Sequence, residues 1–420
     1  MPSADYCAID FGTSNSAIGI AHAGGMRLTE LEPGFRTMPT AVFYNAEDDT
    51  RSYGRAAVKA YVDGYDGRLM RSIKSILGSD LMDQTTEIGH GITIKYHDVV
   101  IGYLKHLKRV AEAQHGRELT RAIIGRPVWF VDNDAGRDAR AQASLAGAAR
   151  AAGFTDTAFQ FEPIAAALDY ESTIADEQLV LVADIGGGTS DFSLVRVGPA
   201  RRSRVDRRGD ILANHGVHVA GTDFDRHIEL AHILPVCGYR GVGPSGREVP
   251  SKVYFDLATW HLINTVYAPA RVAELRGMKA WYAQPHHHAR LMTTVQERLG
   301  HALAAAAEQA KIDVATSGLA QIDLQVLEAG LAATLHEAHA AQALEADLAH
   351  IVQAARETAR QAGLAPQDLD ALYFTGGSTG LQPLVQRIAA CFPAAELVRG
   401  DRFASVAQGL GLHARAVFGA

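Results

Sequence analysis

The stretch Asp184-Ile185-Gly186-Gly187-Gly188-Thr189-Ser190-Asp191 decides the fold, because it separates two apolar segments, QLVLVA at 178–183 and FSLVRV at 192–197. Such segments predict buried strands, so the stretch is interpreted as strand, glycine-rich turn and strand. Three successive glycines let the backbone turn tightly and aim several N–H groups at one point, which favours binding of an anion. The carboxylate at each end suits a phosphate-bound Mg²⁺, which prefers oxygen ligands. A plain glycine hairpin is the alternative.

The same pattern stands near the N-terminus, where Asp10-Phe11-Gly12-Thr13-Ser14-Asn15 separates apolar segments at 6–9 and 17–20. Each turn follows an Asp at the end of an apolar strand, and each carries Gly followed by Thr. This internal repeat predicts two lobes of similar core topology, each presenting one turn to a shared cleft. Two such turns can hold phosphates from opposite sides.

Elsewhere strands and helices alternate, which predicts the α/β class. The expected strands are 122–125, 158–161 and 371–375, and the expected helices are 98–115, 132–152, 163–171, 381–390 and 404–417, with mostly helical segments at about 221–314 and 326–362. A third turn, Thr375-Gly376-Gly377-Ser378-Thr379, ends the last of these strands. Its glycines permit close approach of a flat ligand or a phosphate, and an ordinary strand-to-helix turn is the alternative.

The composition is that of a globular protein of two lobes or domains, with 420 residues, 47% hydrophobic and 21% charged. Its formal net charge of −7 disfavours a nucleic-acid partner. Three cysteines without a CxxC pair favour a reducing compartment. The sequence shows no leader peptide and no apolar run that could span a bilayer, so we expect a cytoplasmic protein without a membrane partner.

Two clusters and one single residue have plain interpretations. The arginines Arg201, Arg202, Arg204, Arg207 and Arg208 are expected to form a solvated turn rather than a patch for phosphate or membrane. His286 to His288 follow Pro285 and are expected to form an exposed loop, because three adjacent histidines cannot all face one ion on a helix. Taken alone, Lys74 is a solvated helix lysine.

Taken together, the three turns resemble the heat-shock-protein-70 (Hsp70) family: IDFGTSNS at 9–16 and DIGGGTSD at 184–191 are similar to its two phosphate loops, and TGGST at 375–379 to its adenosine loop. Smaller matches follow in order. They are MRSIKSILG at 70–78 (catalytic-lysine segment), FEPIAAALDY at 161–170 (first connecting segment), GTDFD at 221–225 (start of the helical subdomain) and Glu308 to Lys311 (nucleoside-contacting helix). Segments at 124–127, 159–163 and 400–410 resemble the short YegD-like branch.

The resemblance implies an actin-like Hsp70 ATPase fold, in which two lobes with ribonuclease-H-like cores enclose a nucleotide cleft. We expect lobe I at 1–174 plus 399–420, with an insert at about 37–116, and lobe II at 175–398, with a mostly helical insert at about 227–345. The chain is expected to end where the family's substrate-binding domain begins, so peptide clamping is not implied.

The resemblance also implies ATP or ADP as ligand, with Mg²⁺ and with K⁺ as a further cation. The implied metal-binding residues are Asp10, Asp184 and Asp191. The implied phosphate-binding residues are Gly12, Thr13, Ser14, Gly186, Gly187, Gly188 and Thr189, and the implied nucleoside-binding residues are Glu308, Lys311, Gly376, Gly377 and Ser378. The implied catalytic residues are Lys74, Glu162, Asp184 and Thr189, with Lys74 stabilising charge on the γ-phosphate and Glu162 near the attacking water.

Two departures concern the base. Gly380 stands where the family usually has an arginine that stacks on adenine, and Ala315 replaces a serine that usually contacts the base or ribose. Loss of a cation–π stack costs about 0.5–2 kcal/mol, so we expect weaker ATP binding than in typical relatives.

The resemblance implies a slow ATPase with a chaperone-like or regulatory role, with protein clients or co-chaperones as partners. Two alternatives stay open. One is a sugar or acetate kinase or an exopolyphosphatase of the same superfold. The other is a scaffold that closes on nucleotide without turnover.

Overall fold

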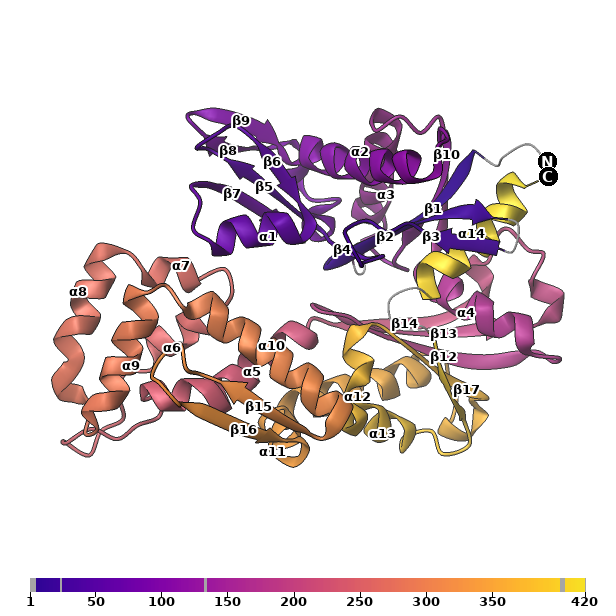
Figure 1. Ribbon diagram of the computed structural model, residues 1–420. Coiled ribbons are helices and arrows are strands. Elements are labelled where there is room, and N and C mark those ends of the chain that lie inside the picture. The colour runs from indigo at the N-terminus through magenta and orange to yellow at the C-terminus, as the bar shows by residue number, and fades with distance from the viewer. Residues whose placement is uncertain (1–4, 23–24, 132–133, 401–404, 420) are drawn as a thin grey trace.

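The structure is a computed structural model that describes residues 5–22, 25–131, 134–400 and 405–419. It shows two lobes, each built around one mixed β-sheet (Figure 1). The helices predicted at 132–152 and 404–417 begin at residues outside the described ranges, and their described parts are helical from Ala135 and from Ser405. We call the lobe that contains the N-terminal strand the first lobe and the other the second lobe.

The first sheet has the strand order β11-β10-β1-β2-β3, and β4 pairs with the start of β2, next to the first turn. Its strands are β1 (Tyr6–Phe11), β2 (Asn15–His22), β3 (Gly25–Leu28), β4 (Met38–Pro39), β10 (Arg121–Arg126) and β11 (Asp156–Phe161). Strand β1 is antiparallel to β2 and parallel to β10. It is almost completely buried, as its unbroken apolar sequence predicts for a central strand.

The second sheet repeats this arrangement in the order β14-β13-β12-β17-β18. Its strands are β12 (Gln178–Ile185), β13 (Ser190–Val197), β14 (Ile211–Val217), β17 (Ala371–Thr375) and β18 (Glu396–Arg399). Strand β12 is antiparallel to β13 and parallel to β17, so it takes the place that β1 has in the first sheet. The repeat of two turns in the sequence is therefore a repeat of topology, and the predicted α/β fold is confirmed.

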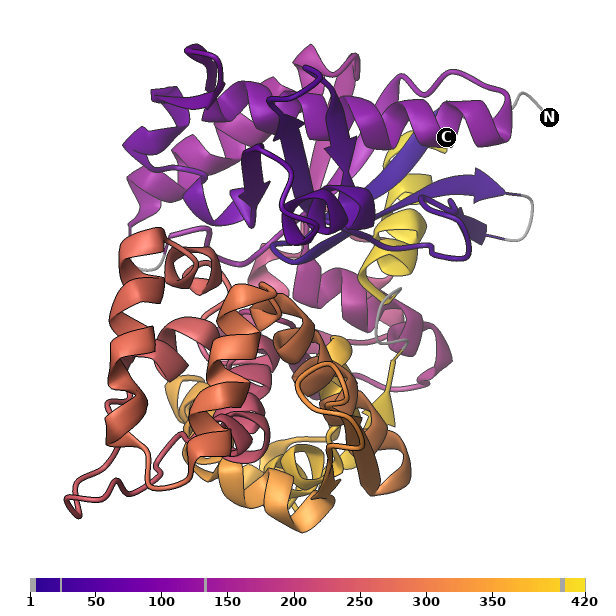
Figure 2. The same cartoon turned by 60° about the vertical axis from the view of Figure 1, so that its left-hand side comes forward.

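Each lobe carries an insert between the elements of its sheet, and Figure 2 shows the helical insert of the second lobe (salmon and orange) below the insert of the first lobe (indigo). The first insert contains β5 (Ala41–Asn45), β6 (Arg51–Tyr53), α1 (Gly54–Val62), β7 (Gly67–Arg71), β8 (Thr85–Gly89), β9 (Ile92–Lys95) and α2 (Tyr96–His115). The second contains α6 (Lys252–Leu257), α7 (Ile263–Val266), α8 (Pro269–Gly277), α9 (Pro285–Gln296), α10 (Gly300–Ser317), β15 (Leu319–Asp323), β16 (Ala332–His336) and α11 (Glu337–Ala343). Helix α5 (Gly221–Ile228) leads into this insert, and α12 (Glu345–Gln361) follows it and packs against β13 and β14 of the second sheet. The remaining helices are α3 (Ala135–Ala151), α4 (Glu162–Thr173), α13 (Gln382–Ala389) and α14 (Ser405–Phe418).

Helices α4 and α14 lie together between the two sheets (Figure 1). They share one apolar core with both sheets, in which Ala8 and Ile123 represent the first lobe and Val180 and Val182 the second. The helices approach so closely that a methyl group on Gly409 would overlap the carbonyl of Ala165. Because apolar burial is continuous across the lobes, the core fixes them to each other at this end of the molecule.

Two predictions about clusters outside the three turns need correction. The arginine cluster does form a turn in which Arg202, Arg204 and Arg208 are exposed, as expected, but Arg207 departs from the prediction. Arg207 is not solvated but is fully buried, because Glu171 and Asp210 pair with it; the distance from Arg207 Nη2 to Glu171 Oε1 is 2.8 Å. A buried guanidinium needs such partners. His286 to His288 form the first turn of α9 rather than a loop, since Pro285 is tolerated at a helix N-terminus. His288 is buried and its Nε2 lies 2.9 Å from the Leu275 carbonyl oxygen.

The segment 326–362, predicted to be helical, contains the second strand of a hairpin before its helices. Strands β15 and β16 pair in antiparallel fashion, with Ala320 opposite Leu335. Alternating burial along β15 fits a strand with one face on the core. The helices α11 and α12 follow only from Glu337.

Candidate functional site

The first and second turns meet at the inner ends of the two central strands. Asp184 pairs with Asp191 in the register of β12 and β13, so the four residues between Ile185 and Ser190 form the turn. A methyl group on Gly187 would lie 2.8 Å from Ser14 Oγ, which belongs to the turn of the other lobe. The two turns are therefore in contact, and a side chain at Gly187 would force the Ser14 hydroxyl to move.

The third turn joins them from the end of β17. Ser378 Oγ donates a hydrogen bond of 2.7 Å to the carbonyl of Gly186. Gly376 has φ +87°, and a methyl group there would lie 2.6 Å from Asp184 Oδ1, so only glycine fits this position. The start of α5 closes the same turn, because Thr222 donates through both its backbone N–H and its hydroxyl to the carbonyl of Gly187, at 2.7 and 2.8 Å.

An ion pair lies beside these turns and links distant parts of the first lobe. Lys74 Nζ donates to Glu162 Oε1 at 2.5 Å, and the side chains are only 8% and 17% exposed. Lys74 lies in a short 3-10 helix after β7, whereas Glu162 begins α4. Gly125 makes room for the carboxylate, since a methyl group there would lie 3.2 Å from Glu162 Cγ. Lys74 is therefore a buried cation and not the solvated helix lysine expected of it alone.

Carboxylates surround this cation. Burial raises the pKa of Asp184 to about 8, and the negative charges of Asp191, Glu162 and Asp10 act in the same direction. Burial also raises the pKa of Asp10 to about 7, and the charge of Glu162 adds to the effect. Although burial opposes the charged form of Lys74, the surrounding carboxylates raise its pKa. The site thus holds four acidic side chains near one lysine, and a bound cation would favour the ionised form of these carboxylates.

The donor set fits a hydrated cation better than a directly ligated one. Among the described residues, no group of three His, Cys, Asp or Glu side chains lies close enough to hold a metal ion. Mg²⁺ usually keeps several waters and binds through one or two carboxylates together with phosphate oxygens. The oxygens of Asp10, Asp184 and Asp191 suit that role, because their charges interact across the turns.

The arrangement of paired sheets and contacting turns agrees with a comparison against protein families: the model described as "Hsp70 protein" matches residues 6–234, more than half of the 420-residue chain. The chain belongs to the Hsp70 family. Members of this family are chaperone-like nucleotide-binding proteins and ATPases that generally use ATP or ADP with Mg²⁺ and generally bind clients or co-chaperones. The matched segment contains the first two turns, Lys74 and Glu162, whereas the third turn and helix α10 lie beyond it.

In this Hsp70 protein, the residues predicted to contact the nucleoside lie on α10 and on the third turn. Lys311 Nζ pairs with Asp225 Oδ1 at 2.7 Å and donates to the Gly221 carbonyl at 3.2 Å. Burial raises the pKa of Asp225 to about 6, although Lys311 acts against the rise. Glu308, one helical turn before Lys311, interacts electrostatically with Asp225 as well. The structure therefore brings α10 and the start of α5 together with the third turn.

The two inserts are joined, at what we call the outer edge of the site, by four residues that the sequence did not single out. We call them the aromatic clasp: Tyr61, Arg71, Trp260 and His301. The rings of Tyr61 and Trp260 stack with their centroids 5.0 Å apart, and the Arg71 guanidinium lies 4.4 Å from the Trp260 centroid. His301 packs edge-on against both rings. Tyr61 and Arg71 belong to the first insert and the other two to the second, so the clasp connects the lobes.

No sequence pattern indicates these clasp residues, since their spacing and types are ordinary. For Arg71, a usable signal was its position at the end of β7, three residues before Lys74. Its charge interacts with Glu308 across the lobes. Thr222 was also passed over, although it lies in the GTDFD segment and closes the second turn.

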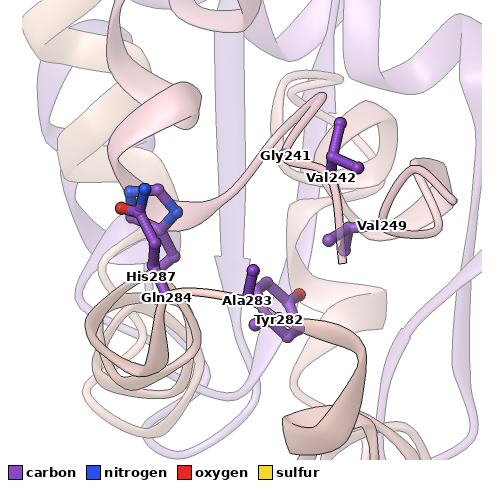
Figure 3. Close-up of a pocket in the computed structure, with 7 residues that line it drawn as sticks. All are labelled: Gly241, Val242, Val249, Tyr282, Ala283, Gln284 and His287. Atoms are coloured by element: carbon purple, nitrogen blue, oxygen red, sulfur yellow. The ribbon is translucent and has the colours of Figure 1, made fainter. Parts of the chain in front are cut away.

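Two cavities lie away from the three turns. One, of about 50 Å³, is too small for a nucleotide and lies in the second insert (Figure 3). It is lined by Gly241, Val242, Val249, Tyr282, Ala283, Gln284 and His287. The other, of about 320 Å³, lies in the first lobe and is discussed below. Within the described ranges, no helix combines the length and the apolar character needed to cross a bilayer.

Proposed function

We propose that this Hsp70 protein binds ATP with Mg²⁺ between the three turns and hydrolyses it slowly, and that nucleotide-dependent closure of the lobes serves a chaperone-like or regulatory role in the cytoplasm. We further propose K⁺ as an accessory cation at Asp10 or Asp191. The observation that carries the proposal is the buried pair of Lys74 and Glu162 beside two contacting glycine turns. The lobe boundaries near 174 and 398 and the YegD-like subgroup remain proposals of the same kind.

The backbone of the first two turns would hold the β- and γ-phosphates. Gly186, Gly187 and Gly188 have no side chains to cover their backbone, and a methyl group on Gly188 would meet no atom within 4 Å, so this turn is open to a ligand. The Gly186 N–H closes the turn by donating to the Thr189 carbonyl at 3.0 Å, and the N–H groups of Gly187 and Gly188 would be the donors to the phosphates. Thr13, Ser14 and Thr189 add hydroxyl groups, and Gly12 supplies the tight bend of the first turn. When bound, Mg²⁺ would neutralise charge on the phosphates, with Asp10, Asp184 and Asp191 around its water shell.

The side chains of the first lobe would carry the hydrolytic step. Lys74 keeps its proton in this acidic site and can stabilise negative charge that develops on the γ-phosphate. Glu162 holds the Lys74 ammonium in place through the 2.5 Å contact. Its second carboxylate oxygen remains available to accept a hydrogen bond from the attacking water. Phosphoryl transfer depends chiefly on such positioning and charge stabilisation.

The second lobe would bind the nucleoside. Glu308 and Lys311 approach from α10, and Gly376, Gly377 and Ser378 approach from the third turn. Ser378 donates a hydrogen bond to the Gly186 carbonyl, so a shift of the third turn on binding of the base would move the phosphate turn as well. This connection supports coupling between nucleotide state and lobe position.

A single-turnover experiment with Lys74→Ala tests the proposal. We expect the variant to bind ATP and to hydrolyse it about 10²–10³-fold more slowly, the usual cost of losing one electrostatic stabiliser of the transition state. Purified protein is mixed in excess over labelled ATP and the released phosphate is followed.

The same assay separates the alternatives. Wild-type protein that binds ATP without releasing phosphate would be a nucleotide-gated scaffold. Rapid phosphate transfer to a panel of sugars and carboxylates would identify a small-molecule kinase, and rapid hydrolysis of polyphosphate would identify an exopolyphosphatase.

A further inference from the structure

The larger cavity lies at the end of the first sheet that is remote from the phosphate turns. It has a volume of about 320 Å³ and is lined by Ile20, Ala21, His22, Arg27, His115, Gly116 and Arg117. Strand β2 begins at Asn15 beside the first turn and reaches the cavity at Ile20 to His22. At about 3.3 Å per residue, the far end of β2 lies on the order of 20 Å from that turn. The cavity is thus separate from the proposed ATP site.

Four of its seven lining residues are basic or titratable, and they come from three segments. His22 ends β2, Arg27 lies in β3, and His115 and Arg117 flank the end of α2. Burial and the positive charges of Arg117, Arg27 and His22 lower the pKa of His115, which shows that these groups act on one another. Of the residues that the structure describes, none with an acidic side chain lines the cavity.

The two arginines are only partly engaged by the protein. Neither Arg27 nor Arg117 pairs with a carboxylate within the described ranges. Arg117 donates from Nη2 to the Ala21 carbonyl at 2.7 Å, whereas its Nε is buried and has no hydrogen-bond partner there. A buried donor without a partner is costly, and an anion would satisfy it.

The acidic residues near the cavity interact with other groups or are exposed. Glu30 accepts a hydrogen bond from the Gly34 N–H at 2.8 Å, and Glu112 pairs with Lys108. Glu118, which follows Arg117, is exposed and does not line the cavity. A structural role, in which cations offset the negative end of α2, would explain Arg117 and His115. It does not explain Arg27, which lies on a different element.

We propose that this cavity binds a small phosphate-bearing anion through Arg27 and Arg117, with His22 and His115 at its edge. Guanidinium groups hold phosphate oxygens through paired hydrogen bonds, which are among the stronger ones in proteins. A concave site of this volume suits a small soluble molecule rather than an extended polyanion, which the net charge of −7 also disfavours.

Titration calorimetry with inorganic pyrophosphate on the full chain tests the proposal. We expect R27Q and R117Q each to weaken the binding of pyrophosphate to this cavity about tenfold or more, as loss of a charge-assisted hydrogen bond implies. R150Q, which removes an exposed arginine from α3, serves as the charge-matched control and is expected to bind like wild type. Nucleotide affinity at the cleft, measured with Mg²⁺ and ADP, should be unchanged in R27Q.

Hydrogen exchange locates the site independently. Pyrophosphate should protect the segments around 20–22 and 113–117 in wild type but not in R27Q, whose mutated side chain is exposed and whose folding is checked by thermal unfolding. Equal affinities of R27Q and R150Q, or protection confined to the phosphate turns, would overturn the proposal. Binding to vesicles of anionic lipid that R27Q abolishes, without binding of free pyrophosphate, would overturn the soluble ligand in favour of a lipid headgroup.

Discussion

The phosphate end of the cleft and its outer edge are built by different means. At the phosphate end, three backbone turns touch one another, and a buried ion pair lies among carboxylates. At the outer edge, contact depends on side chains of the two inserts, chiefly the stacked rings of Tyr61 and Trp260. The shared apolar core joins the lobes behind the first end. We therefore propose that hydrolysis takes place at the phosphate end and that the contacts at the outer edge limit the opening of the lobes.

The largest combined effect on hydrolysis and on stability is expected at Glu162, at the phosphate end. Glu162→Ala leaves the Lys74 ammonium buried without its partner, so we expect hydrolysis to fall about 10²-fold. The free energy of unfolding should fall by about 3 kcal/mol, because the remaining charge is uncompensated. Single-turnover phosphate release and urea unfolding measure the two quantities.

A double variant isolates the ion pair from other losses. Lys74→Met combined with Glu162→Ala removes the orphaned charge, so it should be more stable than Glu162→Ala alone. The exposed pair of Lys59 and Asp63 is the control, since Lys59→Ala should not change stability measurably. If the double variant were less stable than both single variants, the buried pair would not be the source of the effect.

The next effect is a dependence of stability on pH that arises from Asp184. Its pKa is about 8 in the folded protein against an ordinary value of 3.8, so the folded state binds the proton more tightly. Stability should therefore fall as pH rises from about 4 to about 8, and Asp184→Asn should remove this part of the slope. Above pH 8 the variant should be the more stable protein. Urea unfolding of nucleotide-free protein at several pH values measures this dependence of the free energy of unfolding on pH.

The exposed Asp176 provides the matched control, since Asp176→Asn should leave the slope of stability against pH as it is in wild type. Parallel pH profiles for wild type and Asp184→Asn would show that Asp184 titrates normally. The same carboxylate must lose its proton to face a cation. Binding of ADP with Mg²⁺ should accordingly release protons at pH 7, which calorimetry in two buffers detects.

A smaller effect is expected at the outer edge. Tyr61→Ala removes the stacking on Trp260 and the edge contact with His301, worth about 0.5–1.5 kcal/mol per aromatic pair. We expect nucleotide release to accelerate roughly 3–30-fold, with the single-turnover rate of hydrolysis little changed. Stopped-flow displacement of a fluorescent nucleotide measures the release.

Trp281→Ala is the control for the clasp, because Trp281 is 46% exposed and belongs to none of the clasp contacts. Equal release rates in Tyr61→Ala and wild type would mean that the clasp does not limit exit. A large fall in hydrolysis without a change in release would instead place Tyr61 in the chemistry.

The sequence predicts the phosphate end better than the outer edge. The glycine turns were predictable, because three successive glycines and a flanking Asp have few structural uses. The partner of Lys74 lies 88 residues away, and only the fold brings it within 2.5 Å. The clasp and the burial of Arg207 depend on contacts between segments far apart in the chain. Pattern and spacing carry no signal for such contacts.

The smallest effect concerns the base. Ala315 lies on α10, one helical turn after Lys311, and a hydroxyl group there can supply one added hydrogen bond, worth about 0.5–1.5 kcal/mol. We expect Ala315→Ser to tighten ATP binding by about threefold and to leave pyrophosphate binding unchanged, since only the nucleoside is touched. Calorimetry with ATP and with pyrophosphate separates these results. Tighter binding of both ligands would show that α10 acts on the phosphate turns through Lys311 and the Gly221 carbonyl. The binding of the base and the binding of the phosphates would then not be independent.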